Sequence, residues 1–137
     1  MDEMIFSLLR LTERAEQKIA RLNERLERIA EYAFGDTWRQ IDCMLDVIEK
    51  KRRLESALEI RNKLVRGLTE EEYVLLRSRA RGVVPEILTG ERGYSERSIR
   101  RKTAEAVKAA ENILFLLGCD REDLEKKCGK APCDDAA

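Results

Sequence analysis

Histidine is absent from the 137-residue chain. Nucleophilic serine and cysteine residues usually depend on a histidine base, so the common catalytic pairs cannot form. The sequence also lacks a GxxxxGK[ST] phosphate loop and a GxGxxG fingerprint. The carboxylates alternate with arginine and lysine at helical spacing, which is typical of ion pairs on a solvated surface. We therefore expect neither a catalytic site nor a cofactor, and the chain is not expected to be an enzyme.

Cysteine is scarce and carries no metal-binding spacing. Cys119, Cys128 and Cys133 lie near the C-terminus without a CxxC pair, and Cys43 stands far from them. Without histidine, a zinc site would need four thiolates, and these spacings are not those of a zinc ribbon or finger. We expect free thiols and no metal, with Cys43 as a small core residue. The role of the other three stays open.

Aromatic residues make up only 5% of the chain, whereas charged residues make up 39%. The core must therefore be built from Leu, Ile, Val and Ala, in a composition typical of long helices and coiled coils. No apolar run is long enough to cross a bilayer, and the start MDEMIFSLLR lacks the basic segment of a signal peptide. We expect an all-α, cytoplasmic protein without membrane contact. The 27 basic and 27 acidic residues balance, which excludes a globally basic nucleic-acid binder but not a local basic patch.

An apolar stripe with heptad spacing runs through the first segment. From Ala15 onward its positions step alternately by four and three residues, which is the repeat of a coiled coil. Glycine and proline are absent until Gly35. One long helix is therefore predicted, and its narrow stripe must be buried against another helix. The stripe consists of Met4, Leu8, Leu11, Ala15, Ile19, Leu22, Leu26, Ile29 and Ala33.

A second helix is predicted between Gly35 and Gly67, with Asp36 or Thr37 as its cap. The short turn between the helices predicts a long antiparallel, coiled-coil-like hairpin over residues 1–67. This hairpin either folds on itself or pairs with a second copy to form a homodimer. The apolar stripe of the second helix begins with Trp38, Ile41, Leu45 and Ile48.

Residues 68–118 are predicted to form a small helical head. Thr69 and Glu72 have the spacing of a capping box at the start of a third helix, and Gly82 ends that helix. Pro85 favours a short fourth helix over 86–89. The buried face of the third helix is expected to contain Tyr73, Leu76 and Ala80.

A fifth helix follows a turn marked by Gly90 and Gly93. Ser95 is its predicted cap and Gly118 its stop. Residues 119–137 are expected to hold one short helix, over 121–127, and a disordered tail. The buried face of the fifth helix is expected to contain Ile99, Thr103, Ala106, Ala110, Ile113 and Leu117.

The head has the layout of a helix-turn-helix, in which the last helix offers its N-terminal residues to the major groove of DNA. Between Arg92 and Lys102 there are five basic residues and one acid, Glu96. Arginine is the side chain best suited to guanine edges and phosphates. The basic stretch over 50–53 either adds phosphate contacts or is simply solvated. The residues expected to contact DNA are Arg92, Ser95, Arg97, Ser98, Arg100, Arg101 and Lys102.

The segments LTEEEYVLLRSRARG and GYSERSIRRKTAEAV resemble the DNA-binding fourth region of bacterial sigma factors. They are more similar still to prophage-encoded regulators of the ArpU and RinA type, whose turn follows the pattern GYS-[ER]-R-[TS]-[VI]. The match runs over 93–99. Thr89 and Arg92 stand where the family has Ala and Leu. The resemblance implies a phage-derived transcriptional regulator that binds double-stranded DNA at a promoter, beside RNA polymerase or another host protein.

A second interpretation is a helical protein-binding module without nucleic-acid contact, such as a phage-encoded inhibitor or adaptor of a host complex. The zero net charge and the altered first helix of the motif favour it. The heptad stripe fits both interpretations. Binding to DNA that falls steeply with salt would distinguish them, because each neutralised phosphate releases counterions.

Overall fold

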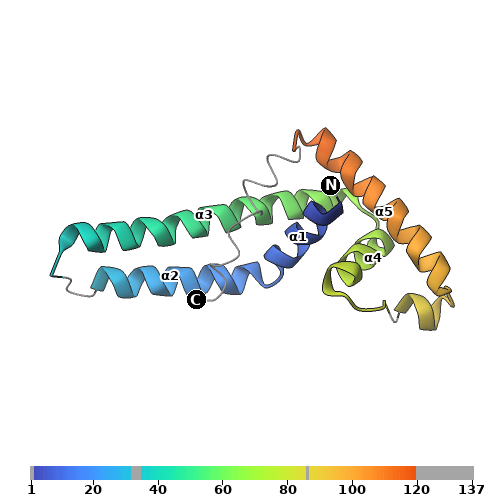
Figure 1. Cartoon of the computed structure of the whole chain (residues 1–137), viewed down its shortest axis with the longest axis horizontal. Helices are drawn as coiled ribbons and strands as arrows, with labels where there is room; N and C mark the ends of the chain where they lie inside the picture. Colours follow the sequence, from blue (N-terminus) through green and yellow to red (C-terminus); the bar gives the residue numbers. More distant parts are fainter. Residues whose placement is uncertain (1, 32–34, 86, 120–137) are drawn as a thin grey trace.

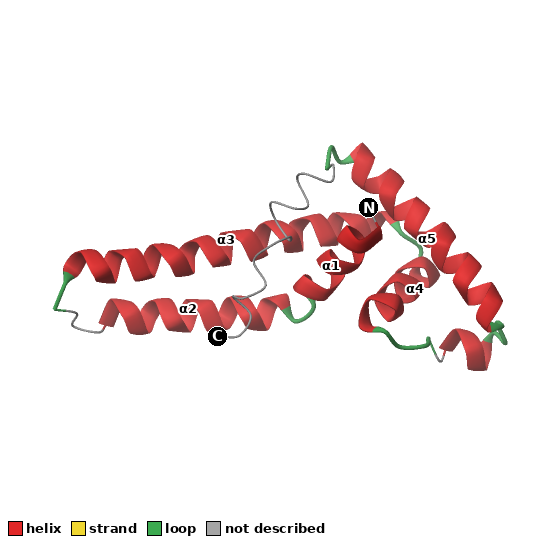
Figure 2. Ribbon diagram, viewed as in Figure 1, coloured by secondary structure: helices red, strands yellow, loops and turns green. Residues whose placement is uncertain are grey.

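The computed structural model describes residues 2–31, 35–85 and 87–119. Within these ranges the chain is helical apart from short connections and contains no strand, so the predicted all-α fold is confirmed (Figure 2). None of the helices in these ranges is long and apolar enough to cross a membrane. The elements are α1 (Asp2–Thr12), α2 (Ala15–Glu31), α3 (Thr37–Gly67), α4 (Glu70–Arg81), η1 (Ile87–Glu91) and α5 (Glu96–Leu116) (Figure 1).

Helices α2 and α3 lie side by side and project from the rest of the molecule (Figure 1). We call residues 15–31 and 37–52 the stem. The stem buries few residues fully, because each of its two helices has only one neighbouring helix to cover its apolar stripe. Ala15 is the only α2 residue that is fully buried. The expected burial of the heptad stripe is therefore only partial, with these positions half-buried: Ile19, Leu22, Leu26 and Ile29.

The first helix is not continuous, contrary to the prediction from its apolar spacing. The chain breaks after Thr12, and Arg14 adopts a left-handed conformation with φ of 58° before α2 begins. The Thr12 hydroxyl donates a hydrogen bond of 2.7 Å to the Leu8 carbonyl and closes α1. Beyond the break, the apolar face of α1 packs on the end of α3 and on α4, and less extensively on α5.

The main core crosses the boundary expected between residues 67 and 68. Leu8 of α1 and Leu64 of α3 are completely buried in the same cluster as Leu76 of α4 and Leu114 of α5. The head is therefore α1, the end of α3, α4, η1 and α5. Burying α1 here removes its apolar surface from water, which the thin stem could not do. The buried cluster comprises Ile5, Phe6, Leu8, Leu9, Ala57, Ile60, Leu64, Leu76, Ala80, Ala106, Val107, Ala110 and Leu114.

Side-chain caps fix the starts of the helices where the sequence predicts them. The Asp36 carboxylate accepts a bond of 3.0 Å from the Trp38 amide at the start of α3. The capping box of α4 is complete: the Thr69 hydroxyl accepts from the Glu72 amide at 3.2 Å, and the Glu72 carboxylate accepts from the Thr69 amide at 2.9 Å. Gly82 ends α4 with φ of 73°. These predictions are confirmed.

The buried face of α5 is shifted from the predicted one. Ala106 and Ala110 are buried as expected, together with Val107 and Leu114, whereas Leu117 is 39% exposed. The fully buried residues of α5 lie between positions 106 and 114, where the helix joins the main core. The other predicted positions are half-buried: Ile99, Thr103 and Ile113. The predicted helix over 121–127, the tail, Cys128 and Cys133 lie outside the described residues.

Candidate nucleic-acid interface

The first turn of α5 is held by two serines of the predicted DNA-contacting set. The Ser95 hydroxyl accepts a hydrogen bond of 3.1 Å from the Ser98 amide, and the two hydroxyl oxygens lie 3.0 Å apart. Ser95 is thus the N-cap of α5, as its sequence position predicts. Both serines act within the protein, where they fix the direction in which α5 begins.

A single wide helical turn precedes α5. The short helix predicted over 86–89 is found as η1, and Leu88 anchors it with only 2% of its surface exposed. The Tyr94 amide donates to the Leu88 carbonyl at 3.1 Å, and Gly93 supplies the positive φ of 65° that the turn requires. The helix that precedes this turn is therefore only one turn long, and it contains Thr89.

Two predicted DNA-contacting cations are held by a carboxylate of α4. The Arg92 guanidinium lies 2.8 Å from one oxygen of Glu71, and the Lys102 ammonium lies 3.8 Å from the other. That second oxygen is shielded from solvent and accepts no hydrogen bond from the described residues. Lys102 also lies 4.7 Å from the centre of the Tyr94 ring. Arg92 and Lys102 therefore fasten α5 and its preceding turn to α4.

Glu71 is a residue that the sequence analysis did not select. It belongs to the acidic first turn of α4, between Glu70 and Glu72, and that turn was interpreted only as a helix start. Its partners lie 21 and 31 positions further along the chain, so no local pattern reveals the pairing. The sequence offers no signal that distinguishes Glu71 from the neighbouring Glu70.

The remaining three arginines of the set face solvent. Arg100 pairs with Glu96 at 3.0 Å, with side chains 77% and 83% exposed, and such exposed pairs contribute little stability. Arg97 and Arg101 are exposed, and neither forms an ion pair with any of the described residues. The first turns of α5 thus present a basic surface consisting of Arg97, Arg100 and Arg101, which we call the α5 arginines.

The basic stretch of α3 has a different environment. Lys51 pairs with Glu55 at 3.7 Å, and Arg53 pairs with Glu49 at 3.5 Å, each within one turn of the same helix. Such pairs are typical of a solvated helical surface. This arrangement favours the solvated interpretation of residues 50–53 over a role in phosphate contact.

A separate apolar surface lies at the start of α3. Trp38, Ile41 and Leu45 are 76%, 40% and 56% exposed, although they were predicted to begin a stripe that packs on another helix. Their spacing of three and four residues places them on one side of α3. We call this set the α3 apolar stripe. Solvation of a tryptophan and two aliphatic side chains together is unfavourable, and such surfaces commonly mark interaction sites.

The four cysteines are only partly described. Cys43 and Cys119 are free thiols, each half-buried, and Cys119 packs against the main core. Among residues 2–31, 35–85 and 87–119, no three or more His, Cys, Asp or Glu residues come together as a metal-binding group.

No family model, no curated protein and no solved structure matches the chain.

Proposed function

We propose that this protein is a phage-derived, DNA-binding transcriptional regulator that works in the cytoplasm and contacts double-stranded DNA through the α5 arginines. The observation that carries the proposal is the exposure of Arg97 and Arg101 without acidic partners in the described chain, at the capped start of a 21-residue helix. The motif over 93–99, which resembles the ArpU and RinA turn, supports the regulatory role.

The geometry of α5 suits entry into a groove by its N-terminal end. An α-helix with its side chains is about 10–12 Å wide, which matches a major groove about 12 Å wide. The exposed amides and the helix dipole at this end attract phosphate. Arg97 and Arg101 are four residues apart and therefore lie on one face of the helix, so both side chains reach the same stretch of duplex.

The Glu71 interactions have a positioning role in this proposal. By holding Arg92 and Lys102, Glu71 fixes α5 relative to α4 before DNA arrives. The α5 arginines are then presented in a defined direction, and less ordering is needed on binding. Arg92, Ser95, Ser98 and Lys102 thus support the interface from within the protein.

The test is binding to a fluorescent 20-base-pair duplex of mixed sequence, measured by anisotropy at about 50 and 200 mM salt, conditions between which phosphate-dependent affinity falls steeply. The variant Arg97→Ala/Arg100→Ala/Arg101→Ala should lose most of the binding. The matched control Arg21→Ala/Arg28→Ala/Arg39→Ala removes the same charge from exposed stem positions and should bind as the wild type does. Equal losses in both variants, or no binding at 50 mM by the folded wild type, would reject the proposal.

A second candidate function is protein binding through the α3 apolar stripe, and the exposure of Trp38 favours it. Its partner would be a second copy of the chain, RNA polymerase or another host protein. A second stem would complete a four-helix bundle over the half-buried stripes of the first. Sedimentation velocity tests the homodimer: Trp38→Ser/Leu45→Ser should convert a dimer to a monomer. A monomeric wild type that does not bind DNA would favour an adaptor or inhibitor of a host complex.

A further inference from the structure

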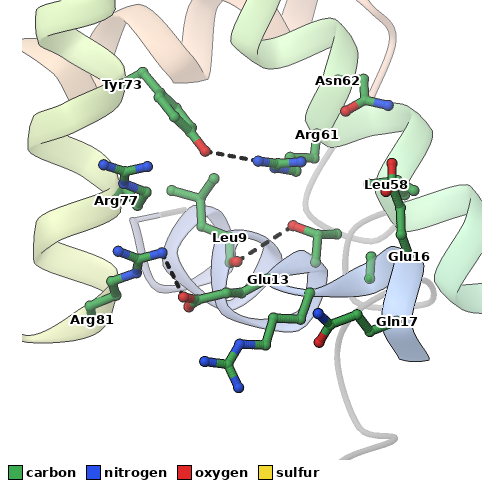
Figure 3. Close-up of a pocket in the computed structure, with 13 residues that line it drawn as sticks. Leu9, Glu13, Glu16, Gln17, Leu58, Arg61, Asn62, Tyr73, Arg77 and Arg81 are labelled. Atoms are coloured by element: carbon green, nitrogen blue, oxygen red, sulfur yellow. Dashed lines mark hydrogen bonds and ion pairs between the residues drawn. The ribbon is translucent and has the colours of Figure 1, made fainter. Parts of the chain in front are cut away.

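A cleft of about 500 Å³ opens where the break between α1 and α2 faces α3 and α4. Its volume lies within the usual range of small-molecule sites, roughly 300–1,000 Å³. Figure 3 shows Arg61 and Tyr73 facing one another from α3 and α4, with Arg77 and Arg81 on the same wall as Tyr73. The lining includes four arginines but only two glutamates, which gives the cleft an excess of positive charge.

One of these arginines is neutralised within the cleft. Arg81 pairs with Glu13 at 2.6 Å, so that cation and that carboxylate satisfy each other. The second glutamate, Glu16, is exposed in the first turn of α2. After this pairing the lining keeps Arg14, Arg61 and Arg77 against Glu16. Because Arg14 and Glu16 are both exposed, the cations that the cleft offers to a ligand are the half-buried Arg61 and Arg77.

Tyr73 brings two of the remaining arginines together. The Arg61 guanidinium donates a hydrogen bond of 2.8 Å to the Tyr73 hydroxyl oxygen. The guanidinium carbons of Arg61 and Arg77 lie 5.9 and 5.4 Å from the centre of the Tyr73 ring. Both arginine residues are half-buried, and neither pairs with a carboxylate of the described residues. Two partly desolvated cations at one ring are a favourable environment for an anion.

Arg61 and Arg77 carry more N–H donors than the hydrogen bond to Tyr73 uses. Each guanidinium carries five N–H donors, and one from Arg61 goes to Tyr73. Because the tyrosine oxygen accepts that bond, its own proton is available to a ligand. The cleft therefore provides donors from α3 and from α4 that converge on one volume, which is the requirement for recognising an oxyanion.

The backbone of Arg14 is a second unusual feature of the same cleft. It is the one non-glycine residue with positive φ in the described chain, and it lines the cleft at the start of α2. Uncommon backbone conformations of this kind are concentrated at binding sites. Here the conformation directs the chain between α1 and α2 around the edge of the cleft.

We propose that this cleft binds a small phosphate monoester, held by Arg61, Arg77 and the Tyr73 hydroxyl. A phosphate monoester presents three terminal oxygens and two negative charges, which suit donors on three side chains better than the two oxygens of a carboxylate do. No residue of α5 lines the cleft. The site is therefore separate from the α5 arginines, and the inference does not depend on DNA binding.

The experiment is isothermal titration calorimetry of the full chain with inorganic phosphate and with adenosine 5′-monophosphate. Both probes should bind saturably at one site. Arg61→Gln/Arg77→Gln should weaken binding at least tenfold. It removes two charge-assisted hydrogen-bond donors, and the loss of one such hydrogen bond alone weakens binding by about that factor. The matched control Arg52→Gln/Arg79→Gln removes two exposed arginines from the same two helices and should leave the affinity unchanged.

A second variant separates recognition from folding. Tyr73→Phe keeps the ring and removes only the hydroxyl, so it should fold normally and bind the phosphates several-fold more weakly. Absence of saturable binding by the folded wild type would overturn the proposal. Equal losses in the two double variants would also overturn it. If acetate binds as tightly as phosphate, the ligand is not a phosphate monoester. The same conclusion follows if duplex DNA displaces the nucleotide.

Discussion

Leu8 and Leu22 occupy equivalent positions in the heptad stripe of the sequence but differ in the structure. Leu8 is completely buried in the head, whereas Leu22 is half-buried on the stem. Replacing a buried leucine by alanine removes its transfer free energy and leaves a cavity, so Leu8→Ala should lower the free energy of unfolding by about 3 kcal/mol. Leu22→Ala leaves little cavity and should lower it by about 1 kcal/mol.

Urea unfolding followed by circular dichroism measures the difference. In a chain of this size each kcal/mol corresponds to roughly 3 °C in Tm, so thermal melting should show losses of about 10 °C for Leu8→Ala and 3 °C for Leu22→Ala. The measurement belongs at low micromolar concentration, where any pairing of stems contributes least. Equal losses, or a greater loss for Leu22→Ala, would contradict the break at Arg14 and would indicate one uninterrupted helix buried along its whole length.

Three further predictions concern the head. Glu71→Ala should lower the free energy of unfolding by about 1–2 kcal/mol in urea titrations, because Arg92 and Lys102 lose a partly buried partner; an unchanged midpoint would show that the three residues do not hold α5. Gly67→Ala would place a Cβ atom 2.8 Å from Cδ1 of Ile113, so it should lower the free energy of unfolding by about 1 kcal/mol. In a double-mutant cycle, adding Ile113→Val should recover most of that loss. Additive losses would argue against the close approach of α3 and α5. Thr69→Ala should cost about 1 kcal/mol through loss of the capping box, whereas Thr69→Ser should be nearly neutral, as thermal melting can check.

The features predicted correctly from the sequence depend on neighbouring residues. Asp36, Thr69 and Ser95 each bond to an amide two or three residues ahead, so the short sequence motif contains the whole interaction. The glycine stop at Gly82 has the same local origin. Helix periodicity likewise indicates an all-α fold, because it arises from the backbone geometry of each helix alone.

The features that were missed depend on contacts between distant elements. Neither glycine nor proline marks the break at Arg14, and α1 beyond it packs on α3, α4 and α5, which come later in the chain. The spacing of Trp38 and Leu45 indicates an amphipathic helix but not whether another element covers it. The partners of Glu71 come from later in the chain, so the sequence identified Arg92 and Lys102 as cations without revealing that they are held within the protein.

The central claim is that the α5 arginines bind DNA phosphates and base edges. It is tested most directly by the dependence of the duplex association constant on salt concentration, for the wild type and for Arg97→Ala/Arg101→Ala. Each phosphate contact contributes a slope of about −0.9 to a plot of log K against log salt, so the variant should lose close to two units of slope if both arginines contact phosphates. The exposed-stem control Arg21→Ala/Arg28→Ala should keep the wild-type slope. Identical slopes for the wild type and Arg97→Ala/Arg101→Ala would contradict the claim that the start of α5 is the DNA-binding surface.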